Sequence, residues 1–350
     1  MAISQRALDL HANEPVVLAH DHSMLSVAAN AALLGNPGTL HSDIVPRLKT
    51  ADVDLIGLVV GGDAPLFYLR GQIDDALHDP WRGTQWLIDL FYQELAPCEE
   101  ELVVCLSRAD IETARANRRI AVLLLVEGTG PCVAHPEENP LVALRTLHKL
   151  GVRSVQIDPV PGNPLFEPDH EDEAPEKLSQ LGCEFLAEMN RLGMLVDVAH
   201  FREHGPLLDD IISSSTAPIG SSHGNPRTLT SSPWDAEDKV FHTIQSADGV
   251  CGVKTVAHLG EGKARPQISS MVRNLQHLIS IVGVERITLG LDQFVDVLGK
   301  LGAERLVENL DTLDKLPQLT SALLEAGLRE DDVSEILGAN WLRLLGKVLE

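Results

Sequence analysis

Short apolar, β-branched runs recur along the whole chain, and a longer segment with helical spacing of apolar residues follows each one. They lie at residues 16–19, 55–60, 120–126, 154–157, 195–198, 218–221, 249–253 and 286–290. This alternation is typical of a parallel sheet with crossover helices. No linker or composition break divides residues 1–350, so the pattern favours one α/β domain, a closed (β/α)8 TIM barrel with C-terminal helices within residues 316–345. Two doubly wound domains, or another mixed α/β arrangement, are the alternatives.

The charge of the chain restricts its partners. Fifty-one acidic against 28 basic residues give a formal net charge of -23, which repels phosphate backbones and anionic lipid surfaces. The longest aliphatic run, residues 120–126, is far shorter than the ~20 residues that span a bilayer, and residues 1–15 are too polar for a secretory signal. Five scattered cysteines form no C-x-x-C pair and indicate no thiolate zinc site. We expect a cytoplasmic protein without nucleic acid or membrane partners.

The first run ends in the sequence His20-Asp21-His22. Alternate residues of a strand point to the same face, so His20 and His22 can direct two imidazoles to one point, as a divalent metal requires. Taken alone, the pair fits a structural or surface role equally well. Four other histidines stand on helical or polar stretches and are expected at the surface: His11, His78, His148 and His242.

Later runs also end in groups that can bind metals. Glu127 follows a fully apolar run, where an unpartnered carboxylate would be costly to bury. His200, His223 and Asp292 stand at three further strand ends, and the carboxyl ends of barrel strands converge on one site. Each residue alone could be a hydrogen-bonded structural group, but together the four histidines and two carboxylates fit two Zn2+ ions. Asp197 has the opposite strand parity to His200 and is interpreted as structural.

Several motifs, in order along the chain, resemble those of the membrane (renal) dipeptidase family, zinc metallopeptidases with an amidohydrolase-like barrel. They are Leu125-Val126-Glu127-Gly128, residues 188–194 leading to Asp197 and His200, Ser222-His223, residues 283–286 leading to Gly290-Leu291-Asp292, and residues 337–343. The resemblance runs from His20 to the C-terminus and indicates a divergent, bacterial-type member.

The resemblance implies a ligand set and a reaction. One zinc ion would be held by His20, His22 and Glu127, and a second by Glu127, His200 and His223. Asp292 would be the acid and base of an amide hydrolysis by a zinc-activated water, with a small dipeptide-like molecule as substrate. A homodimer is the quaternary state that the resemblance suggests.

The chain departs from the family at three positions. His22 stands where family members usually have an aspartate, so a neutral ligand replaces an anionic one. Pro159 stands where the family carries a histidine that stabilises the developing oxyanion, and a proline cannot do so. Trp234 occupies the place of an arginine that binds the substrate carboxylate.

Other residues are candidates for substrate binding. Asp158, beside Pro159, would complement a cationic or amine-bearing group of the substrate. Arg227 and Lys254 are candidates for binding a carboxylate or an oxyanion, although both also fit solvated surface positions.

The sequence therefore favours a zinc-dependent, dipeptidase-like hydrolase. A barrel metalloenzyme that acts on a lactone, an ester or a biosynthetic intermediate is one alternative. A degenerate barrel that binds a small ligand without turnover is another, but a potential ligand at every metal position argues against it.

Overall fold

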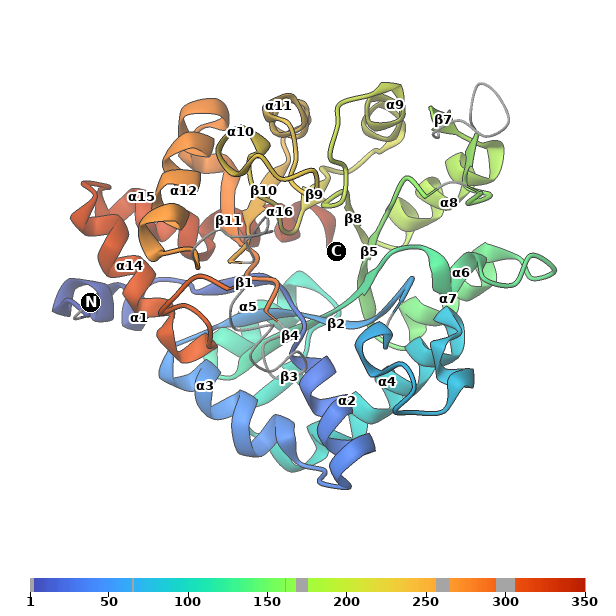
Figure 1. The fold of residues 1–350 in the computed structure, drawn as a ribbon, viewed down its shortest axis with the longest axis horizontal. Helices are drawn as coiled ribbons and strands as arrows, with labels where there is room; N and C mark the ends of the chain where they lie inside the picture. Colours follow the sequence, from blue (N-terminus) through green and yellow to red (C-terminus); the bar gives the residue numbers. More distant parts are fainter. Residues whose placement is uncertain are drawn as a thin grey trace.

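The computed structural model describes residues 3–64, 66–160, 162–167, 176–255, 265–293 and 306–349. Eight parallel strands close into a ring in which each is hydrogen-bonded to the next, and the last returns to the first (Figure 1). The ring consists of β1 (Val17–Asp21), β2 (Leu55–Gly62), β4 (Ile120–Glu127), β5 (Val152–Gln156), β8 (Leu195–Asp197), β9 (Gly220–Ser221), β10 (Val250–Val253) and β11 (Ile287–Leu289). The predicted (β/α)8 barrel is therefore confirmed, and each of the eight predicted runs supplies one strand of the ring.

Within the described ranges, three further strands lie outside the ring. The short β3 (Leu102–Val104) pairs with the first half of β4, and the sequence analysis does not predict it. Strands β6 (Phe166–Glu167) and β7 (Lys177–Leu178) form a small antiparallel pair on the segment between β5 and β8.

Helices follow the strands and surround the ring (Figure 1). They are α1 (Gln5–Asn13), α2 (Ser23–Leu34), α3 (Val45–Thr50), α4 (Pro80–Leu95), α5 (Arg108–Ala116), α6 (Gly130–Val133), α7 (Pro140–Lys149), α8 (Gln180–Arg191), α9 (Pro206–Ser214), α10 (Arg227–Thr230), α11 (Asp238–Ser246), α12 (Ile268–Val282), α14 (Leu316–Glu325), α15 (Glu330–Ser334) and α16 (Asn340–Val348). Side-chain caps fix several helix starts. Asp79 accepts a hydrogen bond from the backbone N–H of Arg82 at the start of α4, and Ser179 caps α8 in the same way. Among the described residues, no helix is both long and apolar enough to cross a membrane.

The two faces of β4 pack against different partners. Ala121, Leu123 and Leu125 belong to a buried cluster that includes residues of α16, whereas the alternate residues pack against the outer helices. This alternation is the period-two pattern of a strand. It also directs Glu127, two positions beyond Leu125, toward the inside of the ring.

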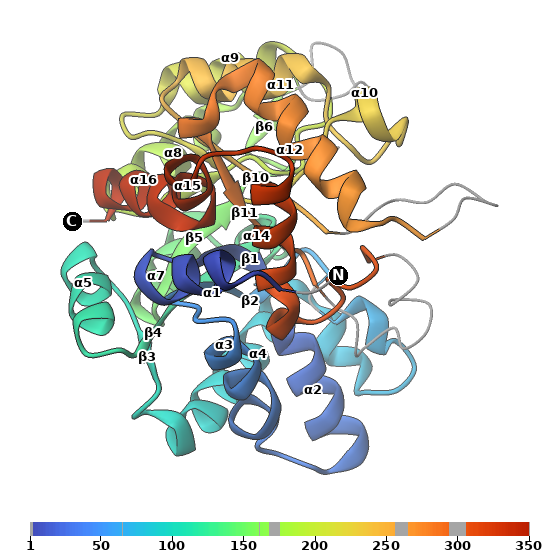
Figure 2. The ribbon, with the colours of Figure 1, turned by 90° about the vertical axis from the view of Figure 1, so that its left-hand side faces the viewer.

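The C-terminal helices confirm the prediction for this region, and α16 closes one end of the barrel (Figure 2). Trp341 of α16 is fully buried, and its ring lies so close to Gly220 of β9 that a Cβ there would be 2.8 Å from the indole. The carboxyl ends of the strands lie at the opposite end of the barrel, which α16 does not cover and where a functional site can form.

One histidine prediction is wrong. His11, expected at the surface, is buried where α1 packs against α14. Its Nδ1 lies 2.9 Å from the backbone oxygen of Ala51 and its Nε2 lies 2.7 Å from Oγ1 of Thr320. Both ring nitrogens are therefore satisfied, which removes the penalty for burying a polar ring.

Candidate metal centre and active site

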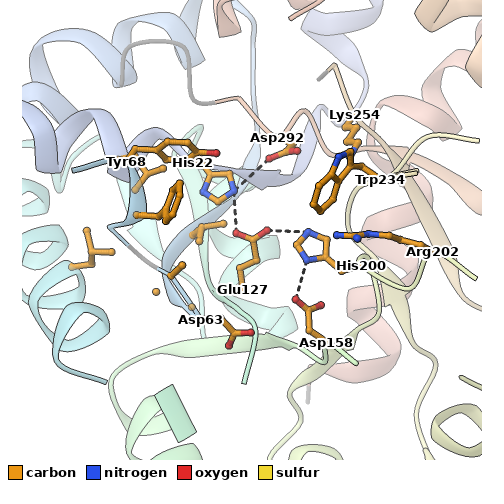
Figure 3. Close-up of a pocket in the computed structure, with 17 residues that line it drawn as sticks. His22, Asp63, Tyr68, Glu127, Asp158, His200, Arg202, Trp234, Lys254 and Asp292 are labelled. Atoms are coloured by element: carbon orange, nitrogen blue, oxygen red, sulfur yellow. Dashed lines mark hydrogen bonds and ion pairs between the residues drawn. The ribbon is translucent and has the colours of Figure 1, made fainter. Parts of the chain in front are cut away.

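A cavity of about 340 Å³ opens at the carboxyl ends of the strands (Figure 3). The structure brings together there all six residues that the sequence analysis selects as metal ligands or acid/base. They come from the ends of β1, β4, β8, β9 and β11 and are His20, His22, Glu127, His200, His223 and Asp292. Convergence from five strand ends is what a closed parallel barrel imposes.

Glu127 lies between His22 and His200 (Figure 3), and each of these histidines is paired with a second imidazole. Its Oε2 is 3.2 Å from Nε2 of His22, and its Oε1 is 3.2 Å from Nε2 of His200. Within each pair the Nε2 atoms face each other at 3.1 Å, His20 with His22 and His200 with His223. One carboxylate thus offers one oxygen to each pair.

Close backbone packing behind Glu127 depends on a glycine. Gly128 has φ +100°, and a Cβ there would lie 2.3 Å from Cγ of Asp63. A side chain at this position would therefore be strained and would collide with a carboxylate that lines the same cavity. In this motif Glu127 provides the carboxylate, and Gly128 leaves the space that the Asp63 side chain occupies.

His20 and His22 approach each other through an irregularity in the strand. The pairing of β1 with β2 shifts register between Leu18 and Asp21, and His22 lies beyond the strand at the start of α2. Strict alternation along β1 is therefore not what aligns the two rings.

A serine orients two of the histidines from behind. Oγ of Ser222 lies 3.0 Å from Nδ1 of His223 and 3.3 Å from Nδ1 of His20. One hydroxyl therefore holds the Nδ1 side of both rings, which leaves Nε2 of His20 facing His22 and Nε2 of His223 facing His200. Asp197 accepts hydrogen bonds from the backbone N–H groups of Ser222 and Ala199, in keeping with its interpretation as structural.

Asp292 reaches the site from the end of β11. Its backbone has φ 55°, a left-handed conformation that is rare outside glycine, and its Oδ1 lies 3.4 Å from Nε2 of His22. Gly290 permits this approach, because a Cβ there would lie 1.8 Å from the backbone oxygen of Ser222. Such strain is typically retained where a side chain must be aimed precisely.

Burial and the nearby carboxylates divide the histidines into two kinds. Burial lowers the pKa of His20 to about 4 and that of His223 well below its usual range, so both are neutral. Burial also opposes charge on His22 and His200, but carboxylates outweigh it. Glu127 and Asp292 raise the pKa of His22 to about 10, and Asp158 and Glu127 hold that of His200 well above its usual range.

The same balance keeps both site carboxylates ionised. Burial opposes ionisation of Glu127, but the charges and hydrogen bonds of His22 and His200 hold its pKa well below its usual range. Burial likewise opposes ionisation of Asp292, but the hydrogen bond and charge of His22 and the charge of Lys254 hold its pKa well below its usual range.

These residues fit a pair of divalent cations. The donor atoms of two groups lie within 4.8 Å of one another, His20, His22 and Glu127 in one and Glu127, His200 and His223 in the other. Imidazole nitrogens with one carboxylate form a donor set that suits zinc. The same carboxylates that raise the pKa of His22 and His200 would also attract a cation, and metal binding to an imidazole releases its proton.

Of the three predicted substrate-binding residues, two line the cavity. Asp158 does so with Oδ2 at 2.9 Å from Nδ1 of His200 and with Oδ1 accepting a hydrogen bond from Nε2 of Gln156 at 2.7 Å. Lys254 also lines the cavity, is 6% exposed, and lies 3.4 Å from the buried carboxylate of Asp235.

Arg227 is not among the residues that line this cavity. Its guanidinium donates to the backbone oxygens of Arg202 and Asp235, and it forms ion pairs with Glu203 at 3.2 Å and Glu237 at 3.5 Å. These contacts hold the connections after β8 and β9 together, which is a structural role.

The sequence analysis misses two charged residues of the cavity, Arg202 and Asp63. The guanidinium of Arg202 stacks on the ring of Trp234 with Cζ 4.2 Å from the ring centroid. Asp63 follows the glycine pair that ends β2, and its Oδ1 accepts a hydrogen bond from the Gly130 backbone at 2.5 Å. A carboxylate directly after a strand is the signal that finds Asp63, whereas nothing local distinguishes Arg202 from a surface arginine.

Comparisons with known proteins show the family of the chain. The family model of membrane dipeptidases (peptidase family M19) matches residues 4–350. Dipeptidase tcpJ of Claviceps purpurea is 27% identical over 308 residues, which cover 85% of this chain and 69% of tcpJ. Dipeptidase verJ of Clonostachys rogersoniana is 26% identical over 282 residues, which cover 79% of this chain and 68% of verJ.

Solved structures share the fold. The probable dipeptidase PvdM from Pseudomonas aeruginosa superposes with a TM-score of 0.78 at 16% identity, covering 98% of each chain. A metallo peptidase from Rhodobacter sphaeroides, liganded with a phosphinate mimic of the dipeptide L-Ala-D-Ala, gives a TM-score of 0.73 at 23% identity, covering 96% of this chain and 99% of that one. The predicted family resemblance is confirmed. The chain belongs to the membrane dipeptidase family, peptidase family M19, and is a metal-dependent, dipeptidase-like hydrolase.

Proposed function

We propose that the protein hydrolyses the amide bond of a dipeptide or a similar N-acyl amino acid with two zinc ions. The observation that carries the proposal is Glu127, whose two oxygens each face one pair of imidazoles at 3.2 Å. Zinc bound at the two positions would polarise the substrate carbonyl and activate water at neutral pH. His20 and His22 would hold one ion, His200 and His223 the other, and Glu127 would contribute to both.

Asp292 is the proton carrier of the proposed reaction. It is an ionised carboxylate at the edge of the metal positions, within 3.4 Å of Nε2 of His22, and it lines the cavity. A carboxylate so placed accepts the proton of the attacking water and returns it to the leaving amine. The left-handed backbone at Asp292 fixes its direction toward the cavity.

Lys254 is the candidate for stabilising the oxyanion. The chain has Pro159 in the place of the family's oxyanion histidine, so another donor is needed. The Lys254 ammonium lines the cavity and is nearly dry, and its contribution to the low pKa of Asp292 places its charge near the proton carrier. A buried ammonium aimed at the reacting carbonyl stabilises negative charge as it develops.

Arg202 is the candidate for the carboxylate end of the substrate. It lines the cavity, and among the described residues it forms no ion pair with an acidic side chain. Trp234 holds the guanidinium plane by stacking, which leaves the N–H groups at its edge for a carboxylate. Trp234 stands in the place of the family's arginine and thus holds a different arginine, Arg202, at the cavity.

Metal analysis and a substrate screen test this function together. Protein purified without chelators should contain two equivalents of zinc, and it should hydrolyse free dipeptides or N-acyl amino acids faster than the corresponding esters or lactones. Removal of the metal should abolish turnover, and added zinc should restore it. Purified protein that holds no transition metal, or that cleaves only esters, would contradict the proposal.

A further inference from the structure

The carboxylate of Asp158 is engaged on both oxygens within the structure. Directly after β5, Oδ2 of Asp158 lies 2.9 Å from Nδ1 of His200, and Oδ1 accepts a hydrogen bond from Nε2 of Gln156. Gln156 is 1% exposed, so the donor that fixes Asp158 is itself immobilised in the barrel. These contacts argue against the expected role of Asp158 in binding a cationic substrate group.

The contact with Asp158 settles which nitrogen of His200 faces the metal position. With Nδ1 hydrogen-bonded to Asp158, Nε2 is the nitrogen that faces the metal position, 3.2 Å from Oε1 of Glu127 and 3.1 Å from Nε2 of His223. A carboxylate behind a ligating histidine fixes its tautomer and ring orientation and raises its basicity as a ligand.

The other supported histidines have a neutral partner. His20 and His223 share the hydroxyl of Ser222, which orients both rings without adding charge. Of the two metal positions, the one formed by Glu127, His200 and His223 therefore has an anion behind one of its imidazoles. The other has His22 where the resemblance would place an aspartate, and the carboxylate beside it, Asp292, faces Nε2 of His22 at 3.4 Å on the metal side rather than supporting the ring from behind.

We propose that Asp158 is a positioning residue for His200 and makes the Glu127–His200–His223 position the tighter of the two metal positions. This inference rests on the proposed two-metal site and adds an order of occupancy to it. In the family, an aspartate at the place of His22 supplies negative charge as a direct ligand of one ion. In this chain Asp158 supplies negative charge instead, behind His200, a ligand of the other ion.

A metal titration tests the inference. Wild type and the Asp158→Asn variant are stripped of metal and titrated with zinc in competition with a chromophoric chelator. We expect Asp158→Asn to weaken one of the two binding steps by about 10–100-fold, the usual cost of losing such a partner, and to leave the other step unchanged. Asp63→Asn is the matched control, because Asp63 lines the same cavity and hydrogen-bonds Gly130 rather than a histidine.

Anomalous scattering from crystals with one equivalent of zinc locates the first ion. In the wild type it should lie between Glu127, His200 and His223, and in Asp158→Asn it should spread to the position of His20 and His22. Unchanged affinities in Asp158→Asn, equal weakening of both steps, or a raised KM with wild-type metal affinity would overturn the inference. A wild-type protein that binds no zinc would instead reject the proposed function, so the two failures are distinct.

Discussion

Glu127 and Asp158 lie on one side of the cavity and the cations Arg202 and Lys254 on another, with Asp292 between His22 and Lys254 (Figure 3). The anionic wall consists of Glu127, which ends β4, and Asp158, which follows β5, and the cationic wall consists of Arg202 and Lys254, which follow β8 and β10. The anionic wall gathers cations, and the cationic wall faces the groups of a substrate that are, or become, negative. The proposed metal positions draw ligands from both halves of the barrel, whereas Arg202 and Lys254, the cations of the cavity lining, both come from the second half.

The largest effect should come from the anionic wall. Replacing Glu127 by Gln keeps the shape of the side chain but removes the charge that both metal positions share. Because bound metal contributes several kcal/mol of charge stabilisation, we expect kcat/KM to fall at least ~10³-fold. Metal content measured by atomic emission should fall with it, whereas Asp63→Asn should retain its metal. A Glu127→Gln protein with two zinc ions and wild-type turnover would break the comparison.

Lys254 should give the next largest effect. Because Lys254→Met alone would leave the Asp235 carboxylate buried without this ion pair, the variant is combined with Asp235→Asn. Losing one oxyanion donor typically lowers kcat by about 10²–10³-fold, and KM should stay close to that of Asp235→Asn alone. Steady-state kinetics measure both values. A rise in KM with unchanged kcat would assign Lys254 to ground-state binding instead.

Arg202 should affect binding more than turnover. Arg202→Gln removes a charged hydrogen-bond donor worth about 1.5–3 kcal/mol, so KM for a free dipeptide should rise by roughly 10–100-fold at similar kcat. A dipeptide with an amidated C-terminus should show little difference between variant and wild type, because it lacks the carboxylate. Arg227→Gln is the matched control, since its guanidinium contacts Glu203 and Glu237 outside the cavity lining.

Substitution of Trp234 should give the smallest effect on KM. It tests whether Trp234 acts only by holding Arg202 in the cationic wall. Its side chain is 54% exposed, and an exposed cation–π contact contributes about 0.5–1 kcal/mol. Trp234→Ala should therefore raise KM about two- to five-fold, and Trp234→Phe should recover part of the loss. An effect of Trp234→Ala that persists in the Arg202→Gln background would show that Trp234 contacts the substrate directly.

The fold and the six converging residues could be predicted from sequence because both follow from strand ends. An apolar run such as residues 120–126 predicts a strand. The closed barrel then brings the residues at the carboxyl ends of its strands together at one end. The prediction needs no loop conformation. It fails at β3, a three-residue strand without a long apolar run.

The substrate-facing charges could be predicted only in part, because they depend on loops. Arg202 and Arg227 are both arginines that follow a strand at some distance, and only the contacts of Glu203 and Glu237 with Arg227 separate their roles. Long side chains reach several ångströms from the backbone, so position along the chain does not fix where a guanidinium lies. His11 fails for a related reason, since its partners Ala51 and Thr320 are remote in sequence.

The packing of Trp341 against Gly220 bears on how the protein acquires its metals. His223 lies three residues after Gly220, and α16, which supplies Trp341, follows every strand of the barrel along the chain. During synthesis His20 and His22 leave the ribosome long before α16, the helix that packs against the strand leading to His223. We therefore expect the proposed metal positions to be completed late in biogenesis, and a ribosome-bound chain that ends before Trp341 should retain less zinc than the full chain.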